Sequence, residues 1–247
     1  MNFKKFYSKY YNLVYKNKNY KFEVDYILRL LKSKKKNIKT ILELGSGTGA
    51  HSEHLIRKGF KITCVEKSSE MISNFKFKSK KIKIINIDLR KLKLKNKFDL
   101  VLSMFHVINY MVKNKDINAF FNTASRHLNS GGILIFDTWY YPAVKYNPPK
   151  KNKKIFIDKK FKMTKVAIPT RIDERIFDIK YLVNIININN SRKFNFIENH
   201  RIRAFNIKEL DKVSKKYNFK KIANYSFLKK TKPSKKNFGA MLIYQKL

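Results

Sequence analysis

Three glycines at alternate positions, Gly45, Gly47 and Gly49, follow a short apolar run that contains Glu43. Glycines at such a turn let the backbone approach a ligand closely, because they adopt dihedral angles that other residues resist. The helical pattern that follows begins with exposed N–H groups that suit a polar or anionic ligand group. The spacing Gly45-x-Gly47-x-x-Ala50 also fits the dinucleotide fingerprint, so the glycines alone do not define the ligand. We expect the Glu43 carboxylate to face the ligand, which favours a cationic cofactor over a pyrophosphate.

Around these residues, predicted strands alternate along the chain with helical or loop segments. Short apolar runs predict five strands at residues 40–44, 61–65, 82–87, 98–103 and 131–137. This alternation is expected of a parallel α/β sheet, which binds its ligands at the carboxyl ends of the strands. Two acids stand at such ends. Glu66 comes 21 residues after Gly45, where an acid can bind both hydroxyls of a ribose, and Asp88 ends the third run.

The pattern of one acid followed by three spaced glycines resembles motif I of the class I S-adenosylmethionine (SAM) methyltransferases, whose cofactor carries a sulfonium and an ammonium. The match runs in order over about residues 38–140. It implies a Rossmann-like α/β fold with a mostly parallel seven-stranded sheet, helices on both faces, a small antiparallel β insertion, and SAM as the cofactor. In this family an acid at the position of Asp88 lies by the adenine. The implied cofactor-binding residues are Tyr11, Tyr20, Glu43, Gly45, Gly47, Gly49, Glu66, Met71, Asp88, Leu89 and Met104.

Segments elsewhere are similar to one subgroup, the N,N-dimethyltransferases of nucleotide-linked amino sugars. These segments are Tyr11 to Val14 with Tyr20, Met104-Phe105, Asp137 to Pro142, Lys180 to Val183, and Glu198 to Ile202 with Phe205. The similarity implies a small-molecule acceptor, namely the amine of a nucleotide-linked amino sugar. An RNA methyltransferase, an O-methyltransferase of another metabolite, and a SAM- or nucleotide-binding protein without turnover remain alternatives.

The loop after the fourth predicted strand holds two candidates for the general base, His106 and Tyr110. An acceptor amine must lose a proton before it attacks, and a base in this loop would reach it. The alternative for His106 is a histidine bonded to the backbone near the sheet edge. The subgroup often has a histidine where this chain has Tyr110, so the identity of the base stays open. No Cys/His cluster supports a metal site.

Four residues outside the cofactor motif are expected to bind the acceptor: Trp139, Tyr140, His200 and Arg201. Trp139 leaves the fifth strand at its ligand-binding edge, where it either anchors the core or stacks on an acceptor ring. His200 and Arg201 either contact a sugar diphosphate, for which arginine offers bidentate contacts, or form a structural pair with Glu198.

The chain divides into four predicted parts: a helical cap (1–36), a SAM-binding core (37–148), an antiparallel β insertion over the active site (149–205), and a last helix with the final core strands (206–247). The aromatic cap either packs on the sheet or acts as a lid over cofactor and acceptor. Within the insertion, residues 175–189 and 192–205 alternate apolar and polar side chains, which predicts an antiparallel pair. Residues 150–168 are predicted to be basic and mobile near their start.

Composition bounds the remaining possibilities. The single cysteine, Cys64, falls inside a predicted strand, which excludes a disulfide and indicates a reducing compartment. No apolar stretch approaches the roughly 20 residues of a membrane span, and no signal peptide is visible, so we expect a cytoplasmic protein. The net charge of +40 suggests nucleic acid, but lysines run through almost every segment. Compositional drift therefore competes with an anionic partner, and a homodimer is also considered.

Overall fold

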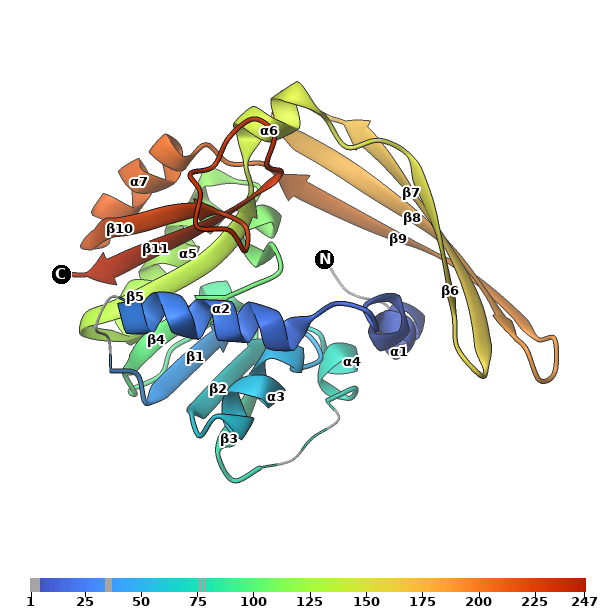
Figure 1. The fold of residues 1–247 in the computed structure, drawn as a ribbon, viewed down its shortest axis with the longest axis horizontal. Coiled ribbons are helices and arrows are strands. Elements are labelled where there is room, and N and C mark those ends of the chain that lie inside the picture. Colours follow the sequence, from blue (N-terminus) through green and yellow to red (C-terminus); the bar gives the residue numbers. More distant parts are fainter. Residues whose placement is uncertain (1–4, 34–36, 76, 78) are drawn as a thin grey trace.

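The computed structural model describes residues 5–33, 37–75, 77 and 79–247. Residues 1–4 and 34–36 of the predicted cap lie outside the described residues. A seven-stranded sheet forms the centre of the molecule (Figure 1). Its strands are β1 (Thr40–Leu44), β2 (Lys61–Glu66), β3 (Ile82–Asn86), β4 (Phe98–Ser103), β5 (Leu128–Trp139), β10 (Phe219–Ser226) and β11 (Gly239–Lys246).

The order of the main sheet is β10-β11-β5-β4-β1-β2-β3. Strands β1 to β5 pair in parallel, whereas β11 runs antiparallel to both of its neighbours. The central strand β1 has buried residues on both faces, as a parallel sheet covered on both sides requires. The predicted Rossmann-like class I sheet is therefore confirmed.

Helices cover both faces of this sheet. Helices α2 (Tyr20–Ser33) and α3 (Ala50–Arg57) pack on one face, against Ile41 of β1 and Ile62 of β2, while α5 (Asn114–His127) and α7 (Ile207–Lys215) pack on the other. Among the described residues, no helix is both long and apolar enough to cross a membrane. The remaining helical segments are α1 (Lys5–Val14), α4 (Ser69–Ile72), α6 (Tyr141–Tyr146) and two 3₁₀ turns, η1 (Leu89–Lys91) and η2 (Val107–Tyr110).

A second, antiparallel sheet stands beside the first (Figure 1). It consists of β6 (Asn152–Ile157), β7 (Phe161–Arg171), β8 (Ile176–Asn187) and β9 (Lys193–Arg203). The predicted antiparallel pair corresponds to β8 and β9, and helix α1 packs on the sheet through Tyr10, whose ring meets that of Phe161 edge-on at 5.1 Å.

Residues 150–168 are predicted to be mobile near their start, but β6 begins there, at Asn152, and β7 follows it. β6 forms the edge of the sheet and pairs with β7 along its whole length, from Asn152 opposite Ala167 to Ile157 opposite Lys162. The segment contains frequent lysines. They are accommodated because most of them lie at exposed positions while the backbone groups pair across the strands.

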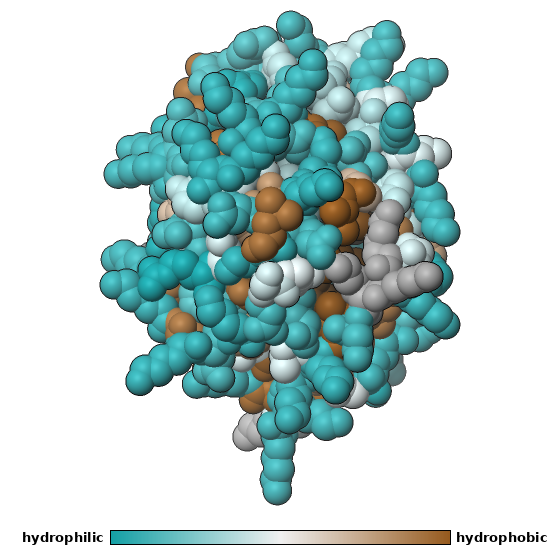
Figure 2. All heavy atoms as spheres, turned by 90° about the vertical axis from the view of Figure 1, so that its left-hand side faces the viewer, coloured by the Kyte–Doolittle hydropathy of each residue, from teal (hydrophilic) through white to brown (hydrophobic). Residues whose placement is uncertain are grey.

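The surface is strongly hydrophilic. Figure 2 shows one face of the molecule, on which hydrophilic side chains extend in all directions and hydrophobic residues appear as small separate spots.

Candidate active site

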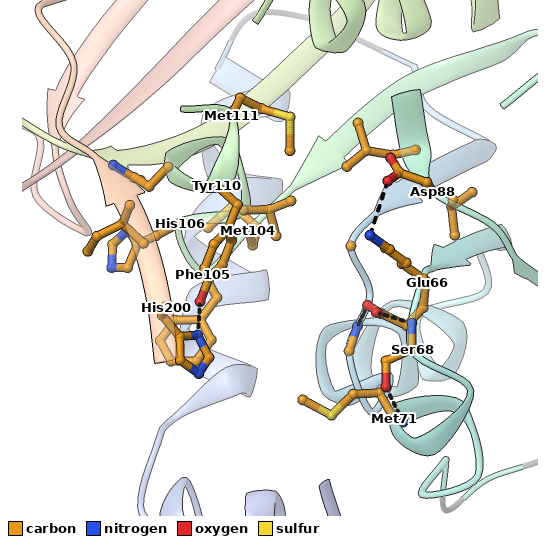
Figure 3. Close-up of a pocket in the computed structure, with 18 of the residues that line it drawn as sticks. Glu66, Ser68, Met71, Asp88, Met104, Phe105, His106, Tyr110, Met111 and His200 are labelled. Carbon is orange, nitrogen blue, oxygen red and sulfur yellow. Dashed lines mark hydrogen bonds and ion pairs between the residues drawn. The ribbon is translucent and has the colours of Figure 1, made fainter. Parts of the chain in front are cut away.

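A cavity of about 370 Å³ lies between the carboxyl ends of the main-sheet strands and the second sheet. This volume falls in the range of small-molecule sites. Figure 3 shows Glu66 and Asp88 on one side of the cavity, with Tyr110 and His200 across from them. Helix α1 contributes Tyr11 to the lining. The site is thus built jointly by the main sheet, the second sheet and the first helix.

The backbone of the glycine loop forms one wall of the cavity and leaves space there for a ligand. Gly47 has a φ of +58°, and a Cβ built at this position would meet no atom within 4 Å. Gly45 lines the same wall. Gly49 does not line the cavity, contrary to the prediction, because it precedes α3 and a Cβ there would collide with the ring of Phe75. The third glycine therefore serves packing, while the first two expose backbone to a ligand.

Glu66 presents a carboxylate at the end of β2. Its Oε2 accepts a hydrogen bond from the Gly47 amide at 2.9 Å, and its Oε1 accepts one from the Ser68 amide at 2.9 Å. The residue is 8% exposed, and burial raises the pKa of its carboxyl above the ordinary 4.5 despite these bonds. An acceptor held in this way fits a pair of hydroxyl donors such as those of a ribose.

Asp88 lines the cavity one strand further along. Two hydrogen bonds from the Arg90 guanidinium, at 2.9 and 2.6 Å, fix its carboxylate and hold the pKa of Asp88 at about 2. Met71 and Leu89 add apolar surface to the lining here, whereas Met104 lies across the cavity beside Phe105 (Figure 3). The wall therefore combines charged acceptors with apolar surface, and it fits the nucleoside part of SAM.

Glu43 does not face the cavity, and the prediction that it contacts the ligand is wrong. It is 1% exposed, accepts a hydrogen bond from the Ser52 hydroxyl, and lies 3.7 Å from Nδ1 of His51. Glu43 shares its strand face with Ile41, which packs under α2 and α3. His51 in turn bonds Glu23 on α2 at 2.7 Å, so these acids tie helices to the sheet.

A second, smaller hollow of about 30 Å³ adjoins the main cavity. Tyr20 lines this hollow and not the main cavity, whereas Tyr11 and Gly47 line both. The ring of Tyr20 meets that of His51 edge-on at 4.9 Å. A hydrogen bond of 2.9 Å from Thr48 to Asn12 joins the glycine loop to α1. The first two helices therefore cover the side of the site that is formed by the glycine loop.

His106 and Asp137 lie in contact at the cavity. Nδ1 of His106 lies 2.9 Å from Oδ2 of Asp137, and its backbone amide donates to Oδ1 at 2.9 Å. Asp137 is fully buried, which raises its pKa, but His106 outweighs burial and holds it below 3.8. Phe105 and His106 have φ angles of 67° and 62°, a left-handed conformation that costs energy in non-glycine residues.

Asp137 was missed as a functional residue in the sequence. In the sequence it stands only as the first residue of a segment that resembles the subgroup. The available signal was an acid directly after the apolar run 133–136 of β5. Its contact with His106 links two residues that are 31 positions apart in sequence, beside the neighbouring strands β4 and β5. Because Asp137 holds Nδ1, Nε2 of His106 remains for a cavity ligand.

Tyr110 and His200 form a second pair across the cavity from Glu66 (Figure 3). The Tyr110 hydroxyl and Nδ1 of His200 are 3.0 Å apart. Burial raises the pKa of Tyr110 well above 10.0, while burial and the charge of Lys165 lower the pKa of His200 to about 3. Tyr110 is therefore protonated and His200 neutral near pH 7. The structure brings together a predicted base and a predicted acceptor-binding residue.

Trp139 lines the cavity, but two other predicted acceptor contacts are wrong. The backbone of Tyr140 donates a 2.8 Å bond to Phe238, and its side chain packs against the core. Arg201 lies on the outer face of the second sheet, where it pairs with Asp178 at 2.6 Å. Successive strand residues face opposite sides, so His200 and Arg201 on β9 cannot both enter the cavity.

Lys165 on β7 is a second residue that sequence reasoning missed, since it is one of many lysines. Its Nζ lies 3.8 Å from the ring centroid of Tyr181 and 5.7 Å from that of Tyr15. Burial, and then the charge of Lys154, lower the pKa of Lys165 to about 7. Within the described part of the chain, no group of three or more His, Cys, Asp or Glu side chains is arranged to hold a metal.

Comparisons with known proteins agree with this geometry. The structure of a SAM-dependent methyltransferase from Clostridium acetobutylicum superposes with a TM-score of 0.80 at 23% identity, covering 98% of each chain. That of Streptomyces venezuelae DesVI gives a TM-score of 0.81 at 18% identity, covering 96% of this chain and 97% of the other. At these identities the similarity defines the fold, which is that of the class I SAM-dependent methyltransferases.

Sequence comparison identifies the domain. Residues 41–132 match a family described as a methyltransferase domain, so the chain carries such a domain, and the prediction of SAM as its cofactor is confirmed. A curated relative, the dTDP-3-amino-3,4,6-trideoxy-alpha-D-glucopyranose N,N-dimethyltransferase of Streptomyces venezuelae, is 27% identical over 134 residues, 53% of this chain and 56% of the relative. The predicted resemblance is confirmed, although the chain spans only about half the length of the curated relatives it matches.

Proposed function

We propose that this protein transfers a methyl group from SAM to the amine of a small-molecule acceptor, and that the acceptor is a nucleotide-linked amino sugar. One observation carries the proposal: a single cavity joins the nucleoside-binding wall to the His106–Asp137 pair. The Streptomyces venezuelae relative, whose name specifies such a sugar, supports the acceptor class.

The residues on the cofactor side of the site bind SAM and orient it. Glu66 would accept the ribose hydroxyls and Asp88 would lie beside the adenine, since both line the cavity, and the backbone at Gly47 leaves room for the ligand. When bound, SAM supplies an activated methyl group on a sulfonium. The remaining task of the chain is to hold the acceptor in line with that methyl group and to exclude water.

The acceptor side moves a proton and closes the site. A sugar ammonium must become a neutral amine before it attacks, and Nε2 of His106 takes that proton. Asp137 keeps Nδ1 protonated and stabilises the imidazolium that forms. Rings from three different elements, Phe105, Trp139 and Tyr181, line this half of the cavity and keep water out. The neutral amine is then held among aromatic surfaces.

An RNA acceptor is favoured only by the +40 charge. The cavity argues for a small molecule, because α1 and the second sheet contribute walls to it and leave the volume of a small-molecule site. An extended strand or a duplex would need an open groove beside the cofactor.

Methyl transfer from radiolabelled SAM tests the proposal directly. The purified protein is offered dTDP-linked amino sugars, small hydroxylated metabolites, and total RNA in separate reactions, and products are identified by mass spectrometry. We expect methylation of the amino sugars, and none by Gly47→Arg, whose side chain would fill the open space beside the loop. Transfer to RNA alone would contradict the proposal. SAM binding without transfer to any acceptor would instead identify a binding protein.

A further inference from the structure

The hydrogen bond between Tyr110 and His200 determines what the cavity offers to an acceptor. Both residues line the cavity, and the hydroxyl lies 3.0 Å from Nδ1. His200 is 3% exposed, and its buried, neutral ring carries one proton on one of two nitrogens. The position of that proton decides whether the Tyr110 oxygen turns its hydrogen or its lone pairs toward the cavity.

The neighbour of the second ring nitrogen selects the tautomer. Nε2 of His200 lies 3.9 Å from Oε2 of Glu198, which is buried beside it on the same face of β9. A carboxylate favours an N–H group on the side that faces it. The negative charge of Glu198 therefore favours the tautomer with its proton on Nε2, which leaves Nδ1 as an acceptor. Tyr110 must then donate its hydroxyl hydrogen to Nδ1, so that only oxygen lone pairs remain for the cavity.

We propose that this arrangement selects nitrogen over oxygen as the methylated atom: the Tyr110 oxygen accepts a hydrogen bond from an N–H that the acceptor keeps throughout the transfer. Here Tyr110 acts as a catalytic residue, and His200 acts as a positioning residue that orients it. The inference rests on the proposed function and deepens it, because the cofactor-binding residues do not distinguish an amine from a hydroxyl.

The chemistry of the two acceptors differs at this point. The lone pair of a neutral amine forms the new bond to the methyl carbon while the carbon–sulfur bond breaks, and the electron pair of that bond stays on sulfur. The nitrogen becomes positive and still carries hydrogen, so its N–H···O bond to Tyr110 strengthens as the charge develops. The product leaves as the methylated ammonium, because Nε2 of His106 already holds the proton that was removed before the attack.

A hydroxyl acceptor gains nothing from the same group. To become a good nucleophile it gives up its only hydrogen, and the resulting oxyanion would face the lone pairs of the Tyr110 oxygen. That contact is repulsive and grows as the proton leaves. The pair therefore stabilises the transition state for N-methylation and opposes O-methylation, which is discrimination by attraction and repulsion together.

The tautomer is measurable without any acceptor. Long-range ¹H–¹⁵N correlation spectra of protein labelled at its five histidines report which ring nitrogen carries the proton, and His200 is assigned by its loss in His200→Asn. We expect the Nε2–H form near pH 7. The Nδ1–H form would overturn the proposal, because the Tyr110 hydrogen would then face the cavity.

Transfer to matched acceptors tests the consequence. The probes are a dTDP-linked amino sugar and the dTDP-sugar with a hydroxyl at the same carbon. We expect Tyr110→Phe and His200→Leu to lower kcat for the amine by ~10- to 100-fold, the effect of losing a hydrogen bond to a charged group, with SAM affinity unchanged. His200→Asn should recover part of the rate, because its amide oxygen can accept from Tyr110. The control Tyr217→Phe removes a tyrosine hydrogen bond of the same 3.0 Å length, to Asn118, far from the cavity.

The outcomes separate this inference from the proposed function. O-methylation of the hydroxyl sugar by the wild-type protein, or a Tyr110→Phe rate within twofold of wild type, overturns the nitrogen selectivity while methyl transfer itself stands. Failure of every sugar nucleotide to react refutes the acceptor class, and the tautomer of His200 then decides the inference.

Discussion

Replacing Glu66 by glutamine should weaken SAM binding through the loss of the charge and of one hydrogen-bond acceptor, since the two side chains have nearly the same shape. Both carboxylate oxygens are already hydrogen bonded, one to the Gly47 amide and one to the Ser68 amide. Glutamine offers one oxygen and one NH₂ group, so one of these two amides would face a donor. The substitution therefore disturbs the glycine loop and removes the charge that the ribose hydroxyls meet.

The expected magnitude follows from two opposing effects. A hydrogen bond to a charged group contributes about 1.5–3 kcal/mol, which corresponds to a ~10- to 150-fold change in Kd. Burial opposes ionisation of Glu66, as its raised pKa shows, and part of that cost disappears in the neutral variant. We therefore expect the Kd for SAM to rise by about 10- to 50-fold, toward the lower end of that range.

Calorimetric titration with SAM measures this change without an acceptor. The control is Glu53→Gln, which removes the charge of a surface glutamate that pairs with Arg57 at 2.8 Å on α3. The control should leave the Kd within twofold of wild type. A Glu66→Gln affinity within threefold of wild type would refute the assignment of Glu66 to the ribose.

The pH dependence gives an independent check. Because burial raises the pKa of Glu66 above 4.5, the folded protein takes up this proton at a higher pH than the unfolded chain does. The protonated carboxyl is a poorer acceptor, so wild-type affinity should fall as pH drops through the raised pKa. The affinity of Glu66→Gln should not show this fall, because the amide does not titrate.

Three further predictions follow from the other groups. Asp137→Asn turns an NH₂ group toward Nδ1 of His106 and favours the wrong tautomer, so kcat should fall by ~10²- to 10⁴-fold at unchanged SAM affinity; a kcat within threefold of wild type would contradict it. Arg201→Ala removes only the outer pair with Asp178, so the acceptor KM should stay within twofold, and a tenfold rise would place Arg201 in the site. The pKa of Lys165 is about 7 in the folded protein and 10.5 in its ordinary state, so the free energy of unfolding rises with pH between these values. In urea titrations, the free energy of unfolding of the wild type should gain about 2 kcal/mol from pH 7 to 9 relative to Lys165→Met. The absence of such a gain would refute the burial of a charged Lys165.

The features that depend on local pattern could be predicted from the sequence. The apolar runs predicted the strands of the parallel sheet, because a strand buried on both faces needs consecutive apolar residues. The acid at the end of a run marked Glu66, and the following glycines marked a backbone that a ligand can approach. Spacing along the chain carries this information, since neighbouring strand ends meet at one edge of the sheet.

Only the tertiary structure decided which side chains meet. Glu43 turned toward α3 and Arg201 turned outward because strand residues alternate between faces, and the packing partners of each face lie far along the chain. The bond between Tyr110 and His200 joins residues 90 positions apart, on a main-sheet loop and on the second sheet. Local periodicity holds no record of such a contact, because it arises only when the two sheets pack against each other.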